Sequence, residues 1–273
     1  MRVVPLVANA RMYAVTPRAA SAWRELFLWV GQRAGVELQW IDHAFPAPLG
    51  ELWSRPDLGC AFMCGFPFAC SERPPKLLAA PVPSTQRYGG KPVYFTDFIV
   101  RAPADFRTLE DTFGGRIGYT VEDSQSGFNA PRHHLLQFRR PVRPTLYRES
   151  VGPLITPRRV IEAVLENRID VGPLDSYCHD LLRKHDPALT DRLRVVATTA
   201  AAPIPPLVAA PDCDGATVSR LRDALLEVGR RPELAKLRDI LLLQGFAAVE
   251  PKTYSVTLER EREAVAAGYP TPA

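Results

Sequence analysis

The sequence has no long apolar stretch and little cysteine. No part of its 273 residues approaches the roughly 20 consecutive apolar residues that span a bilayer, so we expect no direct insertion into a membrane. The five cysteines are an odd number, and Cys60, Cys64 and Cys70 cluster without a C-x-x-C pair. This spacing argues against a disulfide framework and against a metal site. We predict no metal and no cofactor.

The first residues lack the pattern of a secretory signal. Met1 and Arg2 lead directly into Val3–Val7, with no extended apolar region and no small-residue cleavage site. We therefore expect a cytoplasmic protein, or a periplasmic one from which a signal has been removed.

The net charge of the chain is small, and by itself it neither excludes nor requires a charged partner. The 34 Lys and Arg residues only slightly outnumber the 30 Asp and Glu residues, which gives a net charge of +4. The pairs Arg139-Arg140, Arg158-Arg159 and Arg230-Arg231 are far apart in the chain, whereas nucleic-acid binders concentrate basic residues on one face. We expect no nucleic-acid partner, and a mild bias toward small anions.

Proline is abundant, with 27 residues, and the hydrophobic fraction is 46%, which is typical of a folded chain with many connections. Short apolar runs alternate with amphipathic segments, which predicts an α/β protein with mostly parallel pairing. The expected strands are Val3–Ala8, Glu37–Ile41, Leu58–Met63, Leu77–Pro83, Val93–Arg101, Arg116–Thr120, Pro141–Leu146, Ile169–Gly172 and Leu193–Thr198. The expected helices include those after Thr16, after Gly127, and at Leu49–Trp53, Pro157–Glu166, Ser176–His185, Asp214–Arg230, Pro232–Leu243 and Val256–Ala267.

Two extended segments frame the middle of the chain. Val93–Arg101 leads into a complete α/β unit, and Pro203–Ala210 leads out of it. We therefore expect two lobes of mixed, mostly parallel sheet flanked by helices: residues 1–97 with 204–273 as a discontinuous lobe one, and residues 98–203 as an inserted lobe two.

Five segments form a recognisable pattern, in this order: Val93–Arg101, Gly114–Tyr119, Ser124–Phe128, Val160–Val164 and Asn167–Val171. Through them the sequence resembles the phosphonate-type solute-binding proteins of ABC transporters. The resemblance implies a type 2 periplasmic-binding-protein fold, in which a small molecule is enclosed between lobes by a hinge motion, and an ABC permease as partner. Arg11–Tyr13, Cys64–Pro67 and Arg87-Tyr88 resemble a branch whose members often lack a signal peptide.

The turn Asp123–Gly127 is the main candidate for ligand binding. It falls between a predicted strand and a predicted helix, where unsatisfied backbone N–H groups favour an anion. Ser124 and Ser126 add hydroxyl donors beside Gln125, and Gly127 lets the backbone approach closely. An ordinary helix cap is the alternative for the same residues. Asp123 complicates an anionic ligand, because its carboxylate would repel a phosphoryl group, hydrogen-bond a protonated one, or point away from the site.

Further candidates lie at other predicted strand ends. Tyr13 follows the first strand, Gly65 and Phe66 follow the strand Leu58–Met63, and Tyr94 lies at the junction of the lobes; core packing is the alternative for Tyr13. Arg87 is placed to pair with an anion. The resemblance adds Ser150, Asp175 and Tyr177, and Asp175 is either a contact for a ligand amine or a helix cap.

Catalysis has little support in the sequence. There is no G-x-S-x-G, H-E-x-x-H or phosphate-binding loop motif, and no catalytic residue is assigned. His133 and His134 are adjacent, so their side chains diverge by about 100° on a helix and do not share a ligand. A non-catalytic binding protein is the leading interpretation. A cytoplasmic enzyme on the same fold, of the menaquinone or thiamin-pyrimidine type, and a sensor or partner-binding module remain as alternatives.

Overall fold

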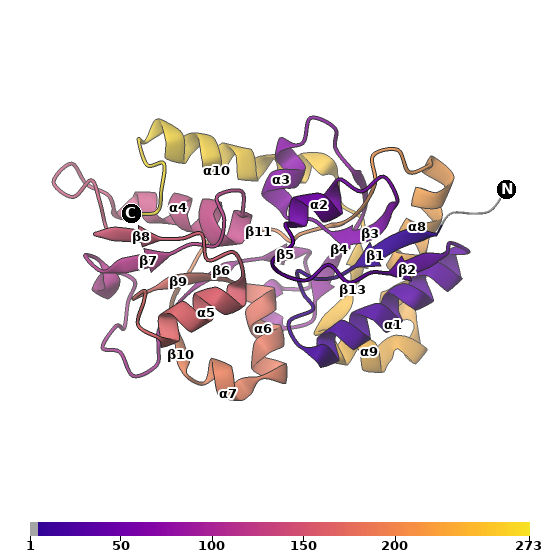
Figure 1. Ribbon diagram of the computed structural model, residues 1–273, viewed down its shortest axis with the longest axis horizontal. Coiled ribbons are helices and arrows are strands. Elements are labelled where there is room, and N and C mark those ends of the chain that lie inside the picture. The colour runs from indigo at the N-terminus through magenta and orange to yellow at the C-terminus, as the bar shows by residue number, and fades with distance from the viewer. Residues whose placement is uncertain (1–4) are drawn as a thin grey trace. The chain divides into compact units, whose positions relative to one another are not determined.

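The chain folds into two compact units in the computed structural model, which describes residues 5–273 (Figure 1). Unit 1 contains the chain up to Val93 and Pro203–Thr253, and unit 2 contains Tyr94–Ala202 and Tyr254–Ala273. The crossings near residues 93 and 203 lie close to the expected ones. The C-terminal residues 254–273, which we expected in lobe one, instead belong to unit 2.

Specific side-chain bonds hold the C-terminal segment in unit 2. Helix α10 (Ser255–Ala266) runs beside α4 (Ala130–Leu135), as Figure 1 shows. Asn129 Nδ2 donates to the carbonyl of Thr257 at 2.8 Å, and the buried Arg132 forms an ion pair with Glu261. These bonds depend on long-range pairing, which a helical pattern read from the sequence does not reveal.

Unit 1 is built on a six-stranded mixed sheet. Its strands are β1 (Leu6–Asn9), β2 (Leu38–Trp40), β3 (Leu58–Phe62), β4 (Lys76–Pro83), β12 (Leu207–Ala209) and β13 (Leu243–Ala247), in the order β13-β4-β12-β3-β1-β2. Strand β1 pairs in parallel with β2 and β3, whereas β12 and β13 pair antiparallel with their neighbours. Parallel pairing is thus confined to one half of this sheet. The expected strand began at Val3, and Val3 and Val4 lie outside the described residues.

Local signals define the longest helix of unit 1. Thr16 caps α1 (Pro17–Ala34) by accepting from the N–H of Ala19, and Gly35 ends it with a φ of 62°, a left-handed conformation that favours glycine. The helix buries Trp23 and Phe27 and packs against α8 and α9. The remaining helices are α2 (Leu49–Trp53), α3 (Gly65–Cys70), α8 (Gly215–Glu227) and α9 (Ala235–Ile240), with short 3₁₀ turns at Gln86–Tyr88, Val228–Arg230, Pro232–Leu234 and Pro251–Tyr254.

Strand β13 replaces the end of a predicted helix. We expected a helix over Pro232–Leu243 ended by Gly245, but α9 ends at Ile240, and Leu242 turns the chain with a φ of 48°. Gly245 lies inside β13, where a Cβ atom would come within 2.9 Å of the Cα of Gly229. This glycine permits close packing of two backbones and does not cap a helix.

Unit 2 contains a three-stranded antiparallel sheet and a two-stranded parallel one. The first has the order β10-β6-β9, from β10 (Leu193–Thr198), β6 (Thr96–Arg101) and β9 (Gly172–Asp175). The second pairs β7 (Arg116–Gly118) with β8 (Glu149–Val151), and an Ile117–Val171 bridge lies beside β9. The core includes Phe98, Val100 and Leu135. Short strands β5 (Val93–Tyr94) and β11 (Ala202–Pro203) pair where the chain divides into its units.

Two predicted strands of this unit are wrong in position. Pro141–Leu146 is not a strand: Arg140 and Arg143 exchange backbone hydrogen bonds across a tight turn at Pro141 and Val142, and neither Pro141 nor Pro144 has an N–H to pair in a sheet. The strand follows later, as β8. The strand expected at Ile169–Gly172 begins at Gly172 and runs to Asp175.

The helices of unit 2 agree more closely with the patterns in the sequence. They are α4, α5 (Pro157–Leu165), α6 (Ser176–His185), α7 (Pro187–Thr190) and α10, with a π-helical turn at Gln125–Asn129 and 3₁₀ turns at Glu110–Thr112 and Leu136–Phe138. Thr108 and Asp111 form a reciprocal cap, with Asp111 Oδ2 accepting from the N–H of Thr108 at 2.8 Å and Thr108 Oγ1 accepting from the N–H of Asp111 at 3.4 Å. Side-chain caps at Thr156 and Asp175 set the starts of α5 and α6.

Candidate ligand-binding site

The turn around Ser124 has a defined geometry. Ser124 precedes the π-helical turn Gln125–Asn129, and its Oγ accepts from the N–H of Gly127 at 2.9 Å. Its carbonyl accepts from the N–H of Asn129, also at 2.9 Å. The Ser124 hydroxyl therefore acts as a cap acceptor, and its own O–H proton remains a donor. The cap interpretation and the ligand interpretation are compatible for this residue.

Gly127 is required by packing inside unit 2. A Cβ atom at this position would overlap the Thr120 hydroxyl, and the N–H of Thr120 donates to the Gly127 carbonyl at 3.2 Å. The close approach that glycine permits here is to Thr120. It keeps the turn against the end of strand β7.

The two residues between Ser124 and Gly127 face different surroundings. Gln125 is fully buried, and its Oε1 accepts from Asn129 Nδ2 at 2.8 Å. Ser126 is half-buried, and its carbonyl accepts from Thr96 Oγ1 at 3.0 Å. Gln125 thus supports the turn from within, whereas the Ser126 side chain lies nearer solvent.

Asp175 lies at the same edge of the sheet, because it pairs with Thr96 in the antiparallel register of β9 and β6. Its Oδ1 accepts from the N–H groups of Tyr177 and Cys178, both at 2.9 Å, so it caps α6. Ser176 Oγ accepts from the N–H of Phe95 at 2.9 Å. The edge therefore gathers Thr96, Ser126 and Asp175, and the helix-cap role of Asp175 is confirmed.

Three other predicted residues of unit 2 are less accessible. Tyr177 is buried in α6, and desolvation raises the pKa of its hydroxyl well above the ordinary value. Tyr94 is 1% exposed. Ser150 lies in β8, and its Oγ, like Thr120 Oγ1, is buried with no hydrogen-bond partner among residues 5–273. Since buried hydroxyls are normally hydrogen-bonded, these two hydroxyls are unused donors within the described part of the chain.

In unit 1 the predicted residues follow strands β1, β3 and β4. Tyr13 is buried, and its ring packs edge-on against Phe62 at 4.9 Å between centroids, which is a core contact. Gly65 begins α3 and is buried, and Phe66 is half-buried. Arg87 is half-buried, with its guanidinium 5.7 Å from the centre of the Tyr88 ring.

Asp123 is exposed, yet desolvation of its carboxyl by the surrounding atoms raises its pKa above the ordinary value. A carboxyl that stays protonated to higher pH repels an anion less than an ordinary aspartate.

Sequence reasoning missed a buried pair behind this edge. His179 Nδ1 lies 2.9 Å from Asp97 Oδ2, and the two side chains are 1% and 0% exposed. Thr198 Oγ1 donates to the other carboxylate oxygen at 2.9 Å. The sequence does contain a signal for this pair, because Asp97 is a charged residue within the apolar segment Val93–Arg101. The pair ties α6 and β10 to β6, which carries Thr96.

The described residues contain neither a cluster of metal-ligating side chains nor a membrane-spanning helix. Within residues 5–273 there is no group of three or more His, Cys, Asp or Glu side chains placed to hold a metal ion. Across the same residues, no helix is both long enough and apolar enough to span a bilayer.

Comparisons with solved structures establish the fold. A binding-protein component of a phosphonate ABC transporter from Pseudomonas aeruginosa aligns with a TM-score of 0.79 and 17% identity, covering 97% of this chain and 88% of that chain. PhnD1 from Prochlorococcus marinus, in complex with methylphosphonate, aligns with a TM-score of 0.75 and 16% identity, covering 94% and 97%. A Xanthomonas citri protein bound to ATP aligns with a TM-score of 0.62 and 19% identity, covering 97% and 98%.

The expected α/β fold of the type 2 periplasmic binding proteins is thus confirmed. No curated protein matches the chain significantly. The model of the family described as "ABC transporter, phosphonate, periplasmic substrate-binding protein" matches residues 17–254, which is most of the sequence. The chain belongs to this family of phosphonate-type ABC-transporter substrate-binding proteins.

Proposed function

We propose that this protein binds a small phosphonate-like or phosphate-like anion through the Ser124–Gly127 turn and delivers it to an ABC permease. The observation that carries the proposal is the turn itself, with a capping hydroxyl at Ser124 and a half-buried hydroxyl at Ser126. Both can donate to anion oxygens without adding bulk.

Rigid support for the turn favours this function. Thr96 holds the Ser126 carbonyl, Thr120 packs on Gly127, and Asn129 holds the Gln125 side chain. A site whose donors are fixed before binding loses less conformational entropy when the ligand arrives. The remaining contacts expected from the sequence stay predictions, each within its own unit: Tyr13, Gly65, Phe66, Arg87, Tyr94, Ser150, Asp175 and Tyr177.

The partner and location follow from the family and remain proposals for this chain. A substrate-binding component implies a permease, and the family is described as periplasmic. The cytoplasmic location expected from the first residues stays a prediction, which fractionation of cells expressing the natural gene would test. We propose no nucleic-acid partner, and the oligomeric state is open to measurement by light scattering.

Calorimetric titration tests the ligand class directly. We expect methylphosphonate or inorganic phosphate to bind, and free arginine, a cation, not to bind. Ser126→Ala should weaken anion binding by roughly 1–3 kcal/mol, the value of a hydrogen bond to a charged group. Ser219→Ala, an exposed serine on α8, is the matched control and should leave affinity unchanged.

The stability of the complex gives an independent measurement. An anion at 100 times its dissociation constant should add about 2.7 kcal/mol to the free energy of unfolding. If no anion binds while arginine or a neutral metabolite does, the proposed ligand class is wrong. If anions bind equally to wild type and Ser126→Ala, the turn is a cap only.

A further inference from the structure

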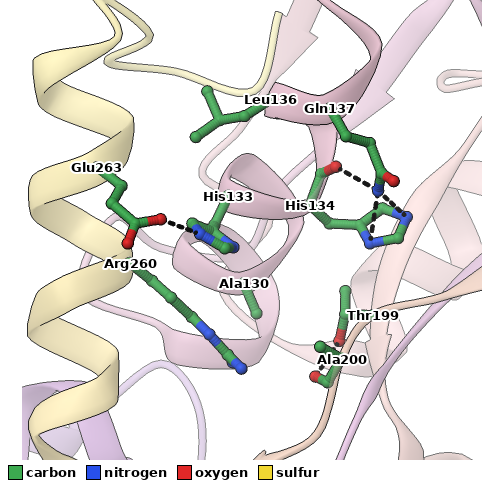
Figure 2. Close-up of a pocket in the computed structure, with 9 residues that line it drawn as sticks. All are labelled: Ala130, His133, His134, Leu136, Gln137, Thr199, Ala200, Arg260 and Glu263. Atoms are coloured by element: carbon green, nitrogen blue, oxygen red, sulfur yellow. Dashed lines mark hydrogen bonds and ion pairs between the residues drawn. The ribbon is translucent and has the colours of Figure 1, made fainter.

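Unit 2 contains a second pocket, which the proposed function does not use. It lies between α4 with the following 3₁₀ turn, helix α10, and the segment Thr199-Ala200, and its volume is about 360 Å³ (Figure 2). Pockets of about 300 Å³ and above accommodate small organic molecules. None of the residues predicted to bind ligand from the sequence lines it.

A buried positive charge lies in its wall. Arg260 is only 9% exposed, and its Nη2 donates to the carbonyl of Ala201 at 2.7 Å. Figure 2 shows its guanidinium extending from α10 toward the side of the pocket formed by Thr199 and Ala200. No carboxylate of residues 5–273 lies within ion-pair distance of this guanidinium, which has five N–H donors.

The acidic side chain in the same wall is engaged elsewhere. Glu263 Oε2 lies 2.7 Å from His133 Nε2, and Figure 2 shows the two side chains turned toward each other. Glu263 is therefore hydrogen-bonded to His133, and Glu263 and Glu259 act on the Arg260 charge only from beyond ion-pair distance. Burial lowers the pKa of Arg260, as expected for a cation removed from water.

The rest of the lining supplies polar and apolar contacts. His134 and Gln137 are side by side in Figure 2, with Gln137 Nε2 donating to the His134 carbonyl at 2.9 Å. Ala130, Leu136 and Ala200 supply short apolar surfaces. A ligand for this lining has one negative group for the guanidinium and a small apolar part.

We propose that this pocket binds a small organic monoanion, a carboxylate with a short apolar chain, whose carboxylate pairs with Arg260. Buried charges in proteins are normally paired, and a bidentate carboxylate matches the planar guanidinium. A single guanidinium near two acidic side chains favours a monoanion over a multiply charged ligand. The pocket is a site separate from the Ser124–Gly127 turn, so either proposal can fail without the other.

Titration with sodium butyrate, followed by NMR of the Arg260, His133 and His134 side chains, tests this proposal. We expect saturable shifts with butyrate, and none with butylammonium, which has a similar shape and the opposite charge. Arg260→Gln should reduce butyrate affinity at least about tenfold, since a charged hydrogen-bonded pair is lost. Arg262→Gln, an exposed arginine on the same helix, should leave affinity unchanged.

A second variant separates binding from folding. Ala200→Phe places a ring in the pocket while Arg260 is retained, and it should abolish the butyrate shifts even if Arg260→Gln unfolds the protein. Methylphosphonate should not displace butyrate. Absence of saturable binding to the folded wild type, equal binding of butylammonium, or unchanged binding in Ala200→Phe would each overturn the proposal.

Discussion

His179 Nδ1 and Asp97 Oδ2 lie 2.9 Å apart in the interior of unit 2, with both side chains almost completely buried. The pair joins α6, whose cap is Asp175, to β6, whose first residue Thr96 holds the Ser126 carbonyl. The candidate site is therefore supported by a polar contact that does not belong to its surface.

Removing Asp97 should destabilise the protein strongly. Asp97→Ala leaves a buried imidazole and the Thr198 hydroxyl without their acceptor, and breaking a buried pair costs about 3–5 kcal/mol. Denaturant unfolding measures this loss. The exposed Asp105→Ala is the control and should change stability by less than about 0.5 kcal/mol. A loss below about 1 kcal/mol for Asp97→Ala would show that His179 finds another partner.

A methyl group at Gly127 should displace the turn from Thr120. Gly127→Ala places a Cβ atom on the Thr120 hydroxyl, and overpacking of this kind costs about 1–3 kcal/mol. We expect lower stability and weaker anion binding, with partial recovery in the double variant Gly127→Ala, Thr120→Gly. Gly215→Ala is the control, because a Cβ atom there meets no atom within 4 Å. Equal behaviour of the two alanine variants would contradict the packing role.

Loss of Arg132 should loosen the C-terminal helix. The Arg132 guanidinium pairs with Glu261 and donates to the carbonyl of Pro270 at 2.9 Å, so Arg132→Ala removes both ties and leaves a cavity. Hydrogen exchange should show faster exchange of the α10 amides. Arg158→Ala, an exposed arginine on α5, should leave the exchange of α10 unchanged. Unchanged protection of α10 in Arg132→Ala would mean that apolar packing alone holds it.

Asp123 should make anion affinity depend on pH. Because its pKa is raised, the carboxyl is neutral below that raised value and becomes negative as pH rises through it. Asp123→Asn should then bind methylphosphonate about two- to fivefold more tightly than wild type at neutral pH, as a nearby charge in water contributes about 1 kcal/mol. The two affinities should converge at low pH, where both side chains are neutral. Calorimetry across pH, with Asp191→Asn as control, measures this ratio, and a constant ratio would place Asp123 away from the ligand.

Features encoded by neighbouring residues could be predicted from the sequence. Thr16 and Gly35 bound α1 as expected, and Ser176–His185 is helical over the predicted range. In such cases a side chain bonds to a backbone group within a few residues, so the signal is contained in the segment itself.

Features that depend on distant contacts could not be predicted. Strand β13 forms because it pairs with β4, and no local pattern marks Leu243–Ala247 as its partner. The burial of Gln125 and Tyr177 likewise follows from the packing around them, which their positions in the sequence do not reveal. The Arg260 pocket was missed because its walls come from three separate segments of the chain.

Unit 2 is completed only by residues 254–273, which bond to Asn129 and Arg132 through Thr257 and Glu261. During synthesis every residue of unit 1 therefore leaves the ribosome before Tyr254–Ala273, the last segment of unit 2, has been made. The sheet of unit 1 can form completely as soon as β13 has been made. The Ser124–Gly127 turn, in contrast, belongs to a unit whose packing is incomplete until α10 has been made. The Ser124–Gly127 turn is thus among the last parts of the newly made protein to acquire its native support.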